Sequence, residues 1–237
     1  MINIQPIEKS VTHDGTTLDV HSIFLTIQGE GPFTGRAAVF IRLAGCNLAC
    51  PGCDTEYTQG RQQTDVKQIL RKVQALAGYD KTSPDLVVIT GGEPFRQNLL
   101  PLVSALLYDN YSVQIETNGT LAPLIPQENP YFWGDVVIVC SPKAGKVNSW
   151  VERNASCYKY VLSHDSVDPE DGLPILALGH SANPRVARPP QDMLVYLQPM
   201  DAQDLAENKK NIDACVVSCL KYNYLFQLQV HKYIGVA

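Results

Sequence analysis

Short apolar runs alternate with amphipathic stretches along most of the chain. Residues 37–43 and 86–89 are apolar at nearly every position, which is typical of strands buried on both faces of a parallel sheet. Residues 66–76 instead carry apolar side chains at helical spacing, preceded by Thr64 and Asp65 as capping candidates. The same criteria predict further helices over 98–108 and 205–220, and further strands over 22–28, 112–116, 136–139, 158–162, 194–197 and 224–228.

The order and number of these elements limit the fold. Strands that alternate with helices indicate βα units and therefore a parallel sheet. The 237 residues hold too few such units for an eight-stranded barrel, so we predict an α/β fold, a partial (open) parallel β/α barrel. We expect a single domain over residues 1–237. Residues 144–190 are loop-rich and contain five prolines, so we interpret them as an insertion in that domain.

Composition and charge argue against two classes of partner. The chain has 45% hydrophobic and 18% charged residues, and 19 Lys+Arg against 24 Asp+Glu give a net charge of −5. Nucleic-acid binding needs a basic stripe, and none is visible. No apolar run approaches the roughly 20 residues that span a membrane, and the first residues lack the basic and apolar parts of a signal peptide. We therefore expect a cytoplasmic protein that binds neither nucleic acid nor membrane.

Three of the seven cysteines crowd into one short segment, Cys46-Asn-Leu-Ala-Cys50-Pro-Gly-Cys53, directly after the strand predicted at 37–43. In a reducing compartment this crowding indicates metal ligation and not disulfides. A four-iron cluster ordinarily takes four thiolates, so three leave one iron open for a cofactor or substrate. A zinc site is the alternative, although structural zinc requires a second cysteine pair or a histidine pair, and the five histidines are scattered.

The other four cysteines are dispersed along the chain. Cys215 and Cys219 stand four apart on one face of a predicted helix, which leaves a second metal site as an alternative there. Cysteines without such partners more often behave as small buried hydrophobic residues. We therefore expect all four to lie in the core: Cys140, Cys157, Cys215 and Cys219.

The cysteine motif is followed downstream by Gly91-Gly-Glu-Pro94 at the end of a predicted strand. This combination resembles the radical S-adenosylmethionine superfamily. A narrower resemblance, to the 7-carboxy-7-deazaguanine synthase family, is carried by residues 24–31, 35–36, 40–43, 53–55, 115–119, 141–143, 198–199 and 231–233. The resemblance runs from about residue 22 to the end, although residues 144–190 carry little of it. About fifteen N-terminal residues precede the usual start of the family.

The resemblance implies a radical enzyme of queuosine and 7-deazapurine biosynthesis, a carbon–nitrogen lyase. Such an enzyme converts 6-carboxy-5,6,7,8-tetrahydropterin to 7-carboxy-7-deazaguanine with release of ammonia. The implied cofactors are a [4Fe-4S] cluster, S-adenosylmethionine and Mg²⁺, and the implied partners are a flavodoxin- or ferredoxin-type reductant and a second copy of the chain in a homodimer. One alternative is a glycyl-radical-activating enzyme, which would share the cluster but bind a peptide. The other is a non-enzymatic zinc-binding module.

The resemblance also implies roles for individual residues around the cofactors. Cys46, Cys50 and Cys53 would hold the cluster. Thr55 would ligate Mg²⁺, because a neutral hydroxyl suits a hard cation that keeps other oxygen ligands; alternatively, Asp54-Thr55 caps a turn. The residues implied to bind S-adenosylmethionine are Gly52, Cys53, Asp54, Gly92, Ser141, Pro142, Lys143 and Gln198. No side chain is implied to be catalytic, because the cofactor supplies the radical.

The implied substrate contacts are Ile27, Gln28, Gly29, Arg42 and Thr90, with Glu30, Glu116, His231 and the C-terminal Ala237 as further candidates. An arginine suits the substrate carboxylate because its planar fork donates two parallel hydrogen bonds. Alternative interpretations remain: Arg42 and Lys143 as surface cations, and Gly91-Gly92 as a plain strand-to-helix turn. Glu93 is expected to hold its loop without touching a ligand.

Overall fold

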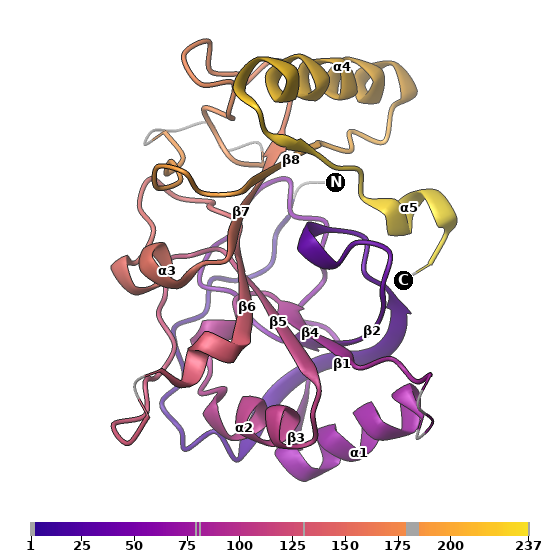
Figure 1. Ribbon diagram of the computed structural model, residues 1–237, viewed down its shortest axis with the longest axis vertical. Helices are drawn as coiled ribbons and strands as arrows, with labels where there is room; N and C mark the ends of the chain where they lie inside the picture. Colours follow the sequence, from indigo (N-terminus) through magenta and orange to yellow (C-terminus); the bar gives the residue numbers. More distant parts are fainter. Residues whose placement is uncertain (1–2, 79, 81, 130, 179–184, 237) are drawn as a thin grey trace.

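Nine strands form one sheet across the described residues, in the order β3-β1-β2-β4-β5-β6-β7-β8-β9. The computed structural model describes the chain except for residues 1–2, 79, 81, 130, 179–184 and 237. From β2 to β9 in this order, neighbouring strands run parallel, whereas β1 pairs antiparallel with both β2 and β3. The prediction of an open, largely parallel β/α barrel is therefore confirmed (Figure 1).

Every strand and helix predicted from the hydrophobic pattern is present, most of them with shifted ends. The strands are β1 Thr17–Ile27, β2 Ala37–Leu43, β3 Gln62–Asp65, β4 Leu86–Gly91, β5 Ser112–Thr117, β6 Val136–Cys140, β7 Cys157–Leu162, β8 Val195–Pro199 and β9 Leu225–Phe226. The helices are α1 Val66–Ala77, α2 Leu100–Tyr108, α3 Ser149–Asn154, α4 Leu205–Tyr222 and α5 Val230–Ile234. Short 3-10 turns cover Gly31–Phe33, Pro94–Arg96 and Phe132–Asp135.

Three of these elements, β3, α3 and α5, were not predicted. The β3 sequence Gln-Gln-Thr-Asp is wholly polar, and the strand exists because it pairs with the start of β1, with Thr17 opposite Asp65. Helices α3 and α5 have six and five residues, which is too short for a helical period to show. Helix α3 lies in the predicted insertion 144–190, where residues 179–184, including His180 and Pro184, lie outside the described residues.

Local sequence signals place the helices where they are needed. The Asp65 carboxylate accepts a hydrogen bond from the Gln68 amide at 2.9 Å, which confirms Asp65 as the cap of α1. Gly78 ends the same helix with a φ of 86°, a conformation that favours glycine. Helices α1 and α2 lie together beside β1, β2 and β5, and α4 lies along β7 and β8 at the opposite end of the molecule (Figure 1).

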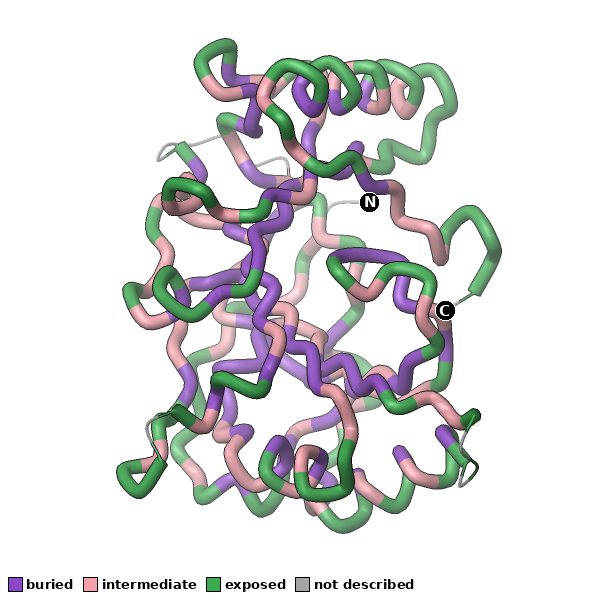
Figure 2. The backbone as a smooth tube through the Cα atoms, in the orientation of Figure 1, coloured by how far each residue is buried: buried purple, intermediate pink, exposed green. Residues whose placement is uncertain are grey.

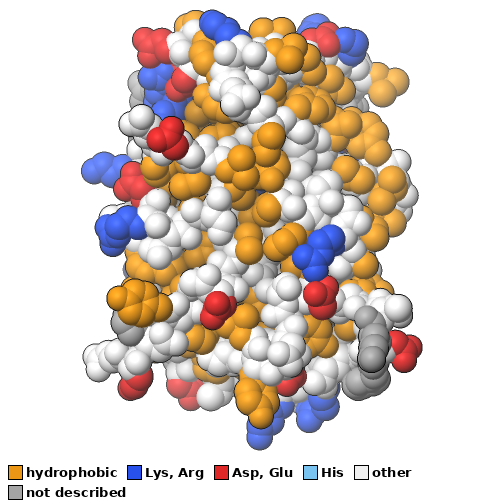
Figure 3. Space-filling model, viewed as in Figure 1, with side chains coloured by type: hydrophobic (Ala, Val, Ile, Leu, Met, Phe, Trp, Pro, Cys, Tyr) orange, Lys and Arg blue, Asp and Glu red, His pale blue; other side chains and the backbone are white. Residues whose placement is uncertain are grey.

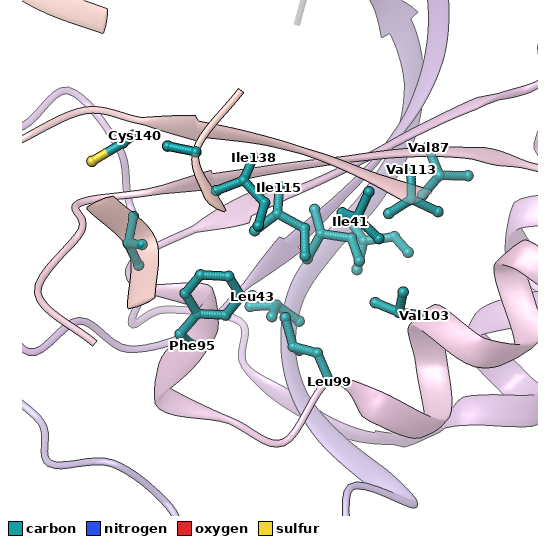
Figure 4. Packing of buried hydrophobic residues seen from close by; sticks show 14 of the residues in the cluster. Ile41, Leu43, Val87, Phe95, Leu99, Val103, Val113, Ile115, Ile138 and Cys140 are labelled. Atoms are coloured by element: carbon teal, nitrogen blue, oxygen red, sulfur yellow. The ribbon is translucent and has the colours of Figure 1, made fainter. Parts of the chain in front are cut away.

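Side chains alternate between the two faces of the parallel strands, and the faces differ in character. Ile41 and Leu43 of β2 belong to the main hydrophobic core, where Leu99 and Val103 approach them from the α2 side (Figure 4). The position between them on β2, Arg42, lies on the other face, inside the partial barrel. Buried residues therefore follow the strands through the middle of the molecule, while outer helices and loops are mostly exposed (Figure 2).

The four remaining cysteines are buried, and the drawn surface carries charges of both signs. Cys140, Cys157, Cys215 and Cys219 are all buried, as predicted, and Cys215 and Cys219 belong to the main core. On the face drawn in Figure 3, lysine and arginine side chains are scattered singly among acidic ones and form no basic stripe. Among the described helices, none is long and apolar enough to cross a membrane.

Candidate active site

A pocket of about 480 Å³ opens inside the partial barrel. It is lined from the carboxyl halves of the parallel strands and the loops that follow them, where open α/β sheets bind their ligands. The register of the sheet aligns these positions, since Arg42 of β2 lies opposite Thr90 of β4, and Val161 of β7 opposite Gln198 of β8. The antiparallel strand β1 and helix α5 complete the wall.

Most of the predicted site residues line this one pocket, although they are spread over more than two thirds of the chain. They are Ile27, Gln28, Arg42, Cys46, Cys50, Gly52, Cys53, Asp54, Thr55, Thr90, Gly92, Ser141, Lys143 and Gln198. Two predicted contacts, Gly29 and Pro142, are not among the lining residues. Of the further candidates, Glu30, Glu116 and His231 line the pocket, and Ala237 lies outside the described residues.

The three thiols of the cysteine motif share one end of the pocket. Burial raises the pKa of each, that of Cys46 to about 12, while the nearby Lys143 cation partly opposes the rise at Cys50 and Cys53. Metal binding would therefore displace thiol protons, as thiolate ligation requires. Within the described chain, no three His, Cys, Asp or Glu side chains form a group that could hold a metal ion. The donor set itself, three cysteines on one loop beside a cation, fits a cluster that takes thiolate ligands.

Gly91 and Gly92, at the end of β4, allow a close backbone approach that a side chain would block. A Cβ at Gly91 would lie 2.1 Å from the Leu43 carbonyl oxygen, and one at Gly92 would lie 2.0 Å from the Gly45 carbonyl oxygen. Both distances are far inside van der Waals contact, so only glycine lets β4 end against the backbone that leads into Cys46. Gly92 also lines the pocket, so tight packing and ligand contact are compatible at this position.

Glu93 ties two loops together, as expected from the sequence. Its buried carboxylate accepts hydrogen bonds from the Phe95 amide at 3.0 Å, the Thr117 hydroxyl at 2.7 Å and the Asn118 amide at 2.8 Å. It is not among the pocket-lining residues. Burial raises the pKa of Glu93 to about 7, and the three hydrogen bonds oppose that rise.

Lys159, a pocket residue that the sequence pattern did not single out, joins Glu30 and Glu116 in a charge network. Lys159 of β7 forms an ion pair with Glu30 and lies 3.6 Å from Glu116. Gln28 donates to Glu116 at 3.0 Å, and Gln229 donates to Glu30 at 2.7 Å. Burial alone would raise the pKa of Glu30, but Lys159 and Gln229 outweigh it and hold the pKa at about 2. The available signal was one lysine inside the otherwise uncharged strand Cys-Tyr-Lys-Tyr-Val-Leu.

Two pocket residues carry buried polar atoms that no other described residue satisfies. These atoms are Nε of Arg42 and Oε1 of Gln198. The Arg42 guanidinium stacks on the Phe24 ring at 5.2 Å from its centroid, and burial lowers its pKa while Asp54 and Glu116 oppose that effect. Buried polar groups without partners are costly in native proteins, so such atoms in a pocket indicate a ligand that bonds to them. An anionic group beside Arg42 would fit.

Ser141 and Lys143 follow β6 and present a hydroxyl and a cation to the cysteine end. The Lys143 ammonium donates to the Ser141 carbonyl at 2.9 Å and to the Ser141 hydroxyl. Burial lowers the pKa of Lys143, and Lys159 adds to the effect. No carboxylate pairs with Lys143 among the described ion pairs, so a second cation in the pocket is available to an anionic ligand.

The segment that follows the third cysteine gives little support to the turn-cap alternative for Asp54-Thr55. The turn is capped by Glu56, whose carboxylate accepts from the Thr58 and Gln59 amides at 2.6 and 2.9 Å. Asp54 instead pairs with Lys232 of α5 at 2.9 Å. Thr55 lines the pocket, and hydrogen bonds from its backbone and side chain partly oppose the burial-driven rise in the Cys53 pKa.

Comparisons with known proteins agree with this geometry. Residues 40–128 match the family model of the radical SAM superfamily. The chain is 40% identical over 243 residues to a 7-carboxy-7-deazaguanine synthase of Rickettsia prowazekii, covering 100% of this chain and 96% of that one. It is 39% identical to one from Rhodospirillum rubrum, covering 94% of both chains. The crystal structure of QueE from Escherichia coli superposes with a TM-score of 0.64 at 25% identity, over 90% of this chain and 93% of that one.

Proposed function

The chain belongs to the 7-carboxy-7-deazaguanine synthase family of radical S-adenosylmethionine enzymes, and we propose that its pocket binds 6-carboxy-5,6,7,8-tetrahydropterin and yields 7-carboxy-7-deazaguanine with release of ammonia. The observation that carries the proposal is that one pocket holds two sets of groups. One set is the three cysteines with the Lys143 cation, and the other is Arg42, whose buried Nε has no partner among the described residues, with the Glu30 and Glu116 carboxylates. A radical cofactor suits the first set, and a polar, carboxylated ring suits the second.

At the cysteine end, Cys46, Cys50 and Cys53 would hold a [4Fe-4S] cluster. Bound together, the cluster and S-adenosylmethionine supply one-electron chemistry and hydrogen abstraction. Lys143 and Ser141 suit the cofactor carboxylate, since they offer a cation and a hydroxyl beside the cluster loop. Gln198 supplies a buried acceptor that suits an amino or hydroxyl group. The cofactor would also meet the backbone of Gly52, Asp54 and Gly92. A cofactor contact for Pro142 rests on the family resemblance alone.

For the substrate, Arg42 would bind the carboxylate through two parallel hydrogen bonds from its guanidinium. Thr90 lies opposite Arg42 in the sheet register and lines the same wall. The carboxylates of Glu30 and Glu116 suit the N–H donors of a pterin edge, as do Ile27, Gln28 and the Gly29 backbone. Lys159 holds the pKa of Glu30 low, so the Glu30 carboxylate is ready to accept hydrogen bonds when substrate arrives.

The proposal also includes a Mg²⁺ ion, a cytoplasmic homodimer and an electron donor. Mg²⁺ would bind at Thr55 and share its remaining oxygen ligands with substrate and water. It would orient the substrate and stabilise developing charge. We further propose a cytoplasmic homodimer that receives electrons from a flavodoxin- or ferredoxin-type protein.

The direct test is anaerobic incubation of reconstituted protein with reductant, S-adenosylmethionine and the carboxytetrahydropterin, with the product identified by mass. The expected product has lost ammonia relative to the substrate. Iron and sulfide should be present at about four each per chain, and Cys46→Ala, Cys50→Ala and Cys53→Ala should each lose both iron and cofactor cleavage. Cofactor cleavage with an unchanged pterin would reject the substrate assignment, and protein that binds zinc but no iron would reject the cluster.

A further inference from the structure

The N-terminal segment 3–11, here called the strap, crosses the loop 45–57 that carries the three cysteines. The Asn3 amide donates to the Pro51 carbonyl at 2.9 Å, and the Asn3 side chain donates to the Cys50 carbonyl at 3.1 Å. Farther along, the Glu8 amide donates to the Cys46 carbonyl at 2.7 Å. The strap thus bonds to the backbone of the first two ligand cysteines and crosses the loop from end to end.

Gln5 makes the most specific of these contacts. Its side-chain nitrogen donates to the Thr55 carbonyl at 2.9 Å, and its side-chain oxygen accepts from the Tyr57 amide at 2.8 Å. The side-chain amide of Gln5 therefore bonds to a backbone carbonyl and to a backbone amide two residues farther on, as the backbone of a neighbouring strand would. The Thr55 carbonyl also faces the Cys53 thiol at 3.8 Å, so Gln5 acts on the backbone that supports the third cysteine.

An ion pair between the buried Arg96 and the partly exposed Glu8 anchors the strap beneath the loop. The Arg96 side chain is 1% exposed, and it bonds to the Glu8 carboxylate at 2.6 Å and to the Lys9 carbonyl at 2.8 Å. Arg61 pairs with the same carboxylate. A Cβ at Gly45 would lie 2.2 Å from the Arg96 guanidinium, so the anchor sits directly against the residue before Cys46. Moving the strap away would leave the buried Arg96 guanidinium without these partners, which is costly, so this anchor fixes where the strap runs.

The loop needs such support because it has no regular structure of its own. Between β2 and β3 the chain forms neither helix nor ladder, yet Cys46 and Cys50 are buried. Backbone polar groups in such a segment must find partners outside it, and the strap supplies them. We propose that the strap is a positioning element that holds the cysteine loop in its ligating conformation, with Gln5 as the positioning residue. The proposal rests on the proposed function only for the identity of the bound cluster.

The test measures the loop in metal-free protein, without S-adenosylmethionine or pterin. Anaerobic wild-type, Gln5→Ala, Gln5→Glu and Lys9→Ala proteins are treated with a maleimide, and modification of each cysteine is followed by mass spectrometry. Cys215, in the core on α4, is the internal reference. Lys9→Ala is the matched control, because it truncates an exposed strap side chain and keeps the carbonyl that Arg96 uses.

Losing the hydrogen bonds to Thr55 and Tyr57 should raise the frequency of local loop opening, so modification of Cys50 and Cys53 in Gln5→Ala should be about tenfold faster. Gln5→Glu keeps the acceptor for Tyr57 but loses the donor to Thr55, so an intermediate rate is expected. Lys9→Ala should match wild type, and Cys215 should be unaffected throughout. In reconstituted protein, iron release to a chelator should accelerate in the same order.

Two results would overturn the proposal. Equal rates at Cys50 and Cys53 in wild type and Gln5→Ala would show that the strap does not order the loop. An equal acceleration at Cys215, accompanied by a lower melting temperature, would show a general loss of stability. Neither readout depends on turnover, so failure here is distinguishable from failure of the synthase assignment.

Discussion

Lys159 and Glu30 form an ion pair across the interior of the partial barrel. Lys159 lies on β7, and Glu30 directly follows β1. In the order of the sheet, β7 is the fifth strand after β1. Both side chains are nearly inaccessible to solvent. A carboxylate oxygen of Glu116, on β5, lies 3.6 Å from the Lys159 ammonium nitrogen. One lysine therefore pairs with the buried Glu30 and lies near the partly buried Glu116, and it connects walls of the pocket that have no backbone hydrogen bonds in common.

Replacing this lysine tests whether the network stabilises the fold. Lys159→Met keeps most of the side-chain volume but leaves the buried Glu30 carboxylate without its cation, so the free energy of unfolding should fall by about 3–5 kcal/mol. Urea denaturation of the metal-free protein measures the change. Lys209→Met, which breaks an exposed pair with Asp213 on α4, should leave the midpoint unchanged. A Lys159→Met midpoint equal to wild type would mean that Glu30 and Glu116 are satisfied by other groups.

Arg42 is the residue that the proposal assigns to the substrate carboxylate. Arg42→Lys retains the positive charge but loses the planar fork, so the KM for the pterin should rise about tenfold or more. S-adenosylmethionine binding, measured by equilibrium dialysis, should be unchanged because the proposal gives Arg42 no contact with the cofactor. If cofactor and substrate binding weaken equally, the arginine has a structural role instead.

The buried Glu93 carboxyl predicts a specific pH dependence of stability. Its pKa is raised from 4.5 to about 7 in the folded protein, so between these values the folded state holds a proton that the unfolded state releases. The associated stability is complete below about pH 4.5 and is lost as the pH rises through 7, about 3 kcal/mol in all. Glu93→Gln cannot titrate, so its stability relative to wild type should increase from pH 5 to pH 8.

Urea denaturation of metal-free Glu93→Gln and wild type across this pH range measures that difference. The exposed Glu128→Gln serves as the control, and its stability relative to wild type should not change with pH. Parallel curves for Glu93→Gln and wild type would show that the Glu93 carboxyl has the same pKa in the folded and unfolded states.

Much of the sheet and most of the pocket lining could be predicted because their signals are local. A buried parallel strand such as 86–89 is an apolar run, and Asp65 caps α1 through an amide three residues away. Thr90, Gly92 and Ser141 follow strands, and parallel strands bring their carboxyl ends to one edge of the sheet. Their meeting in one pocket therefore follows from the topology once the strands are placed.

The remaining features depend on partners remote in sequence, and no local pattern reveals them. Lys159 is explained by Glu30, 129 residues away, and Gln5 by Thr55, 50 residues away. The polar strand β3 is ordered only by its pairing with β1. In each case a polar side chain or segment that would be expected at the surface is fixed by a tertiary hydrogen bond or ion pair.

The Thr55 hydroxyl provides the sharpest test of the proposed Mg²⁺ site. Thr55→Ala removes the oxygen, Thr55→Val removes it with little change of shape, and Thr55→Ser retains it. If this oxygen ligates the cation, the first two variants should need roughly tenfold or more Mg²⁺ for half-maximal turnover, and Thr55→Ser should stay close to wild type. A hard cation with few protein ligands loses much of its affinity with each one removed, so excess Mg²⁺ should partly rescue the variants.

Turnover is therefore measured against Mg²⁺ concentration for all four proteins, with iron content determined in parallel. Iron content is the necessary control because Thr55 also hydrogen-bonds to Cys53, so a damaged loop would lower turnover at every Mg²⁺ concentration. A loss of metal affinity instead shifts the curve along the concentration axis and leaves the plateau largely recoverable. Superimposable curves with full iron content would remove Thr55 from the metal site.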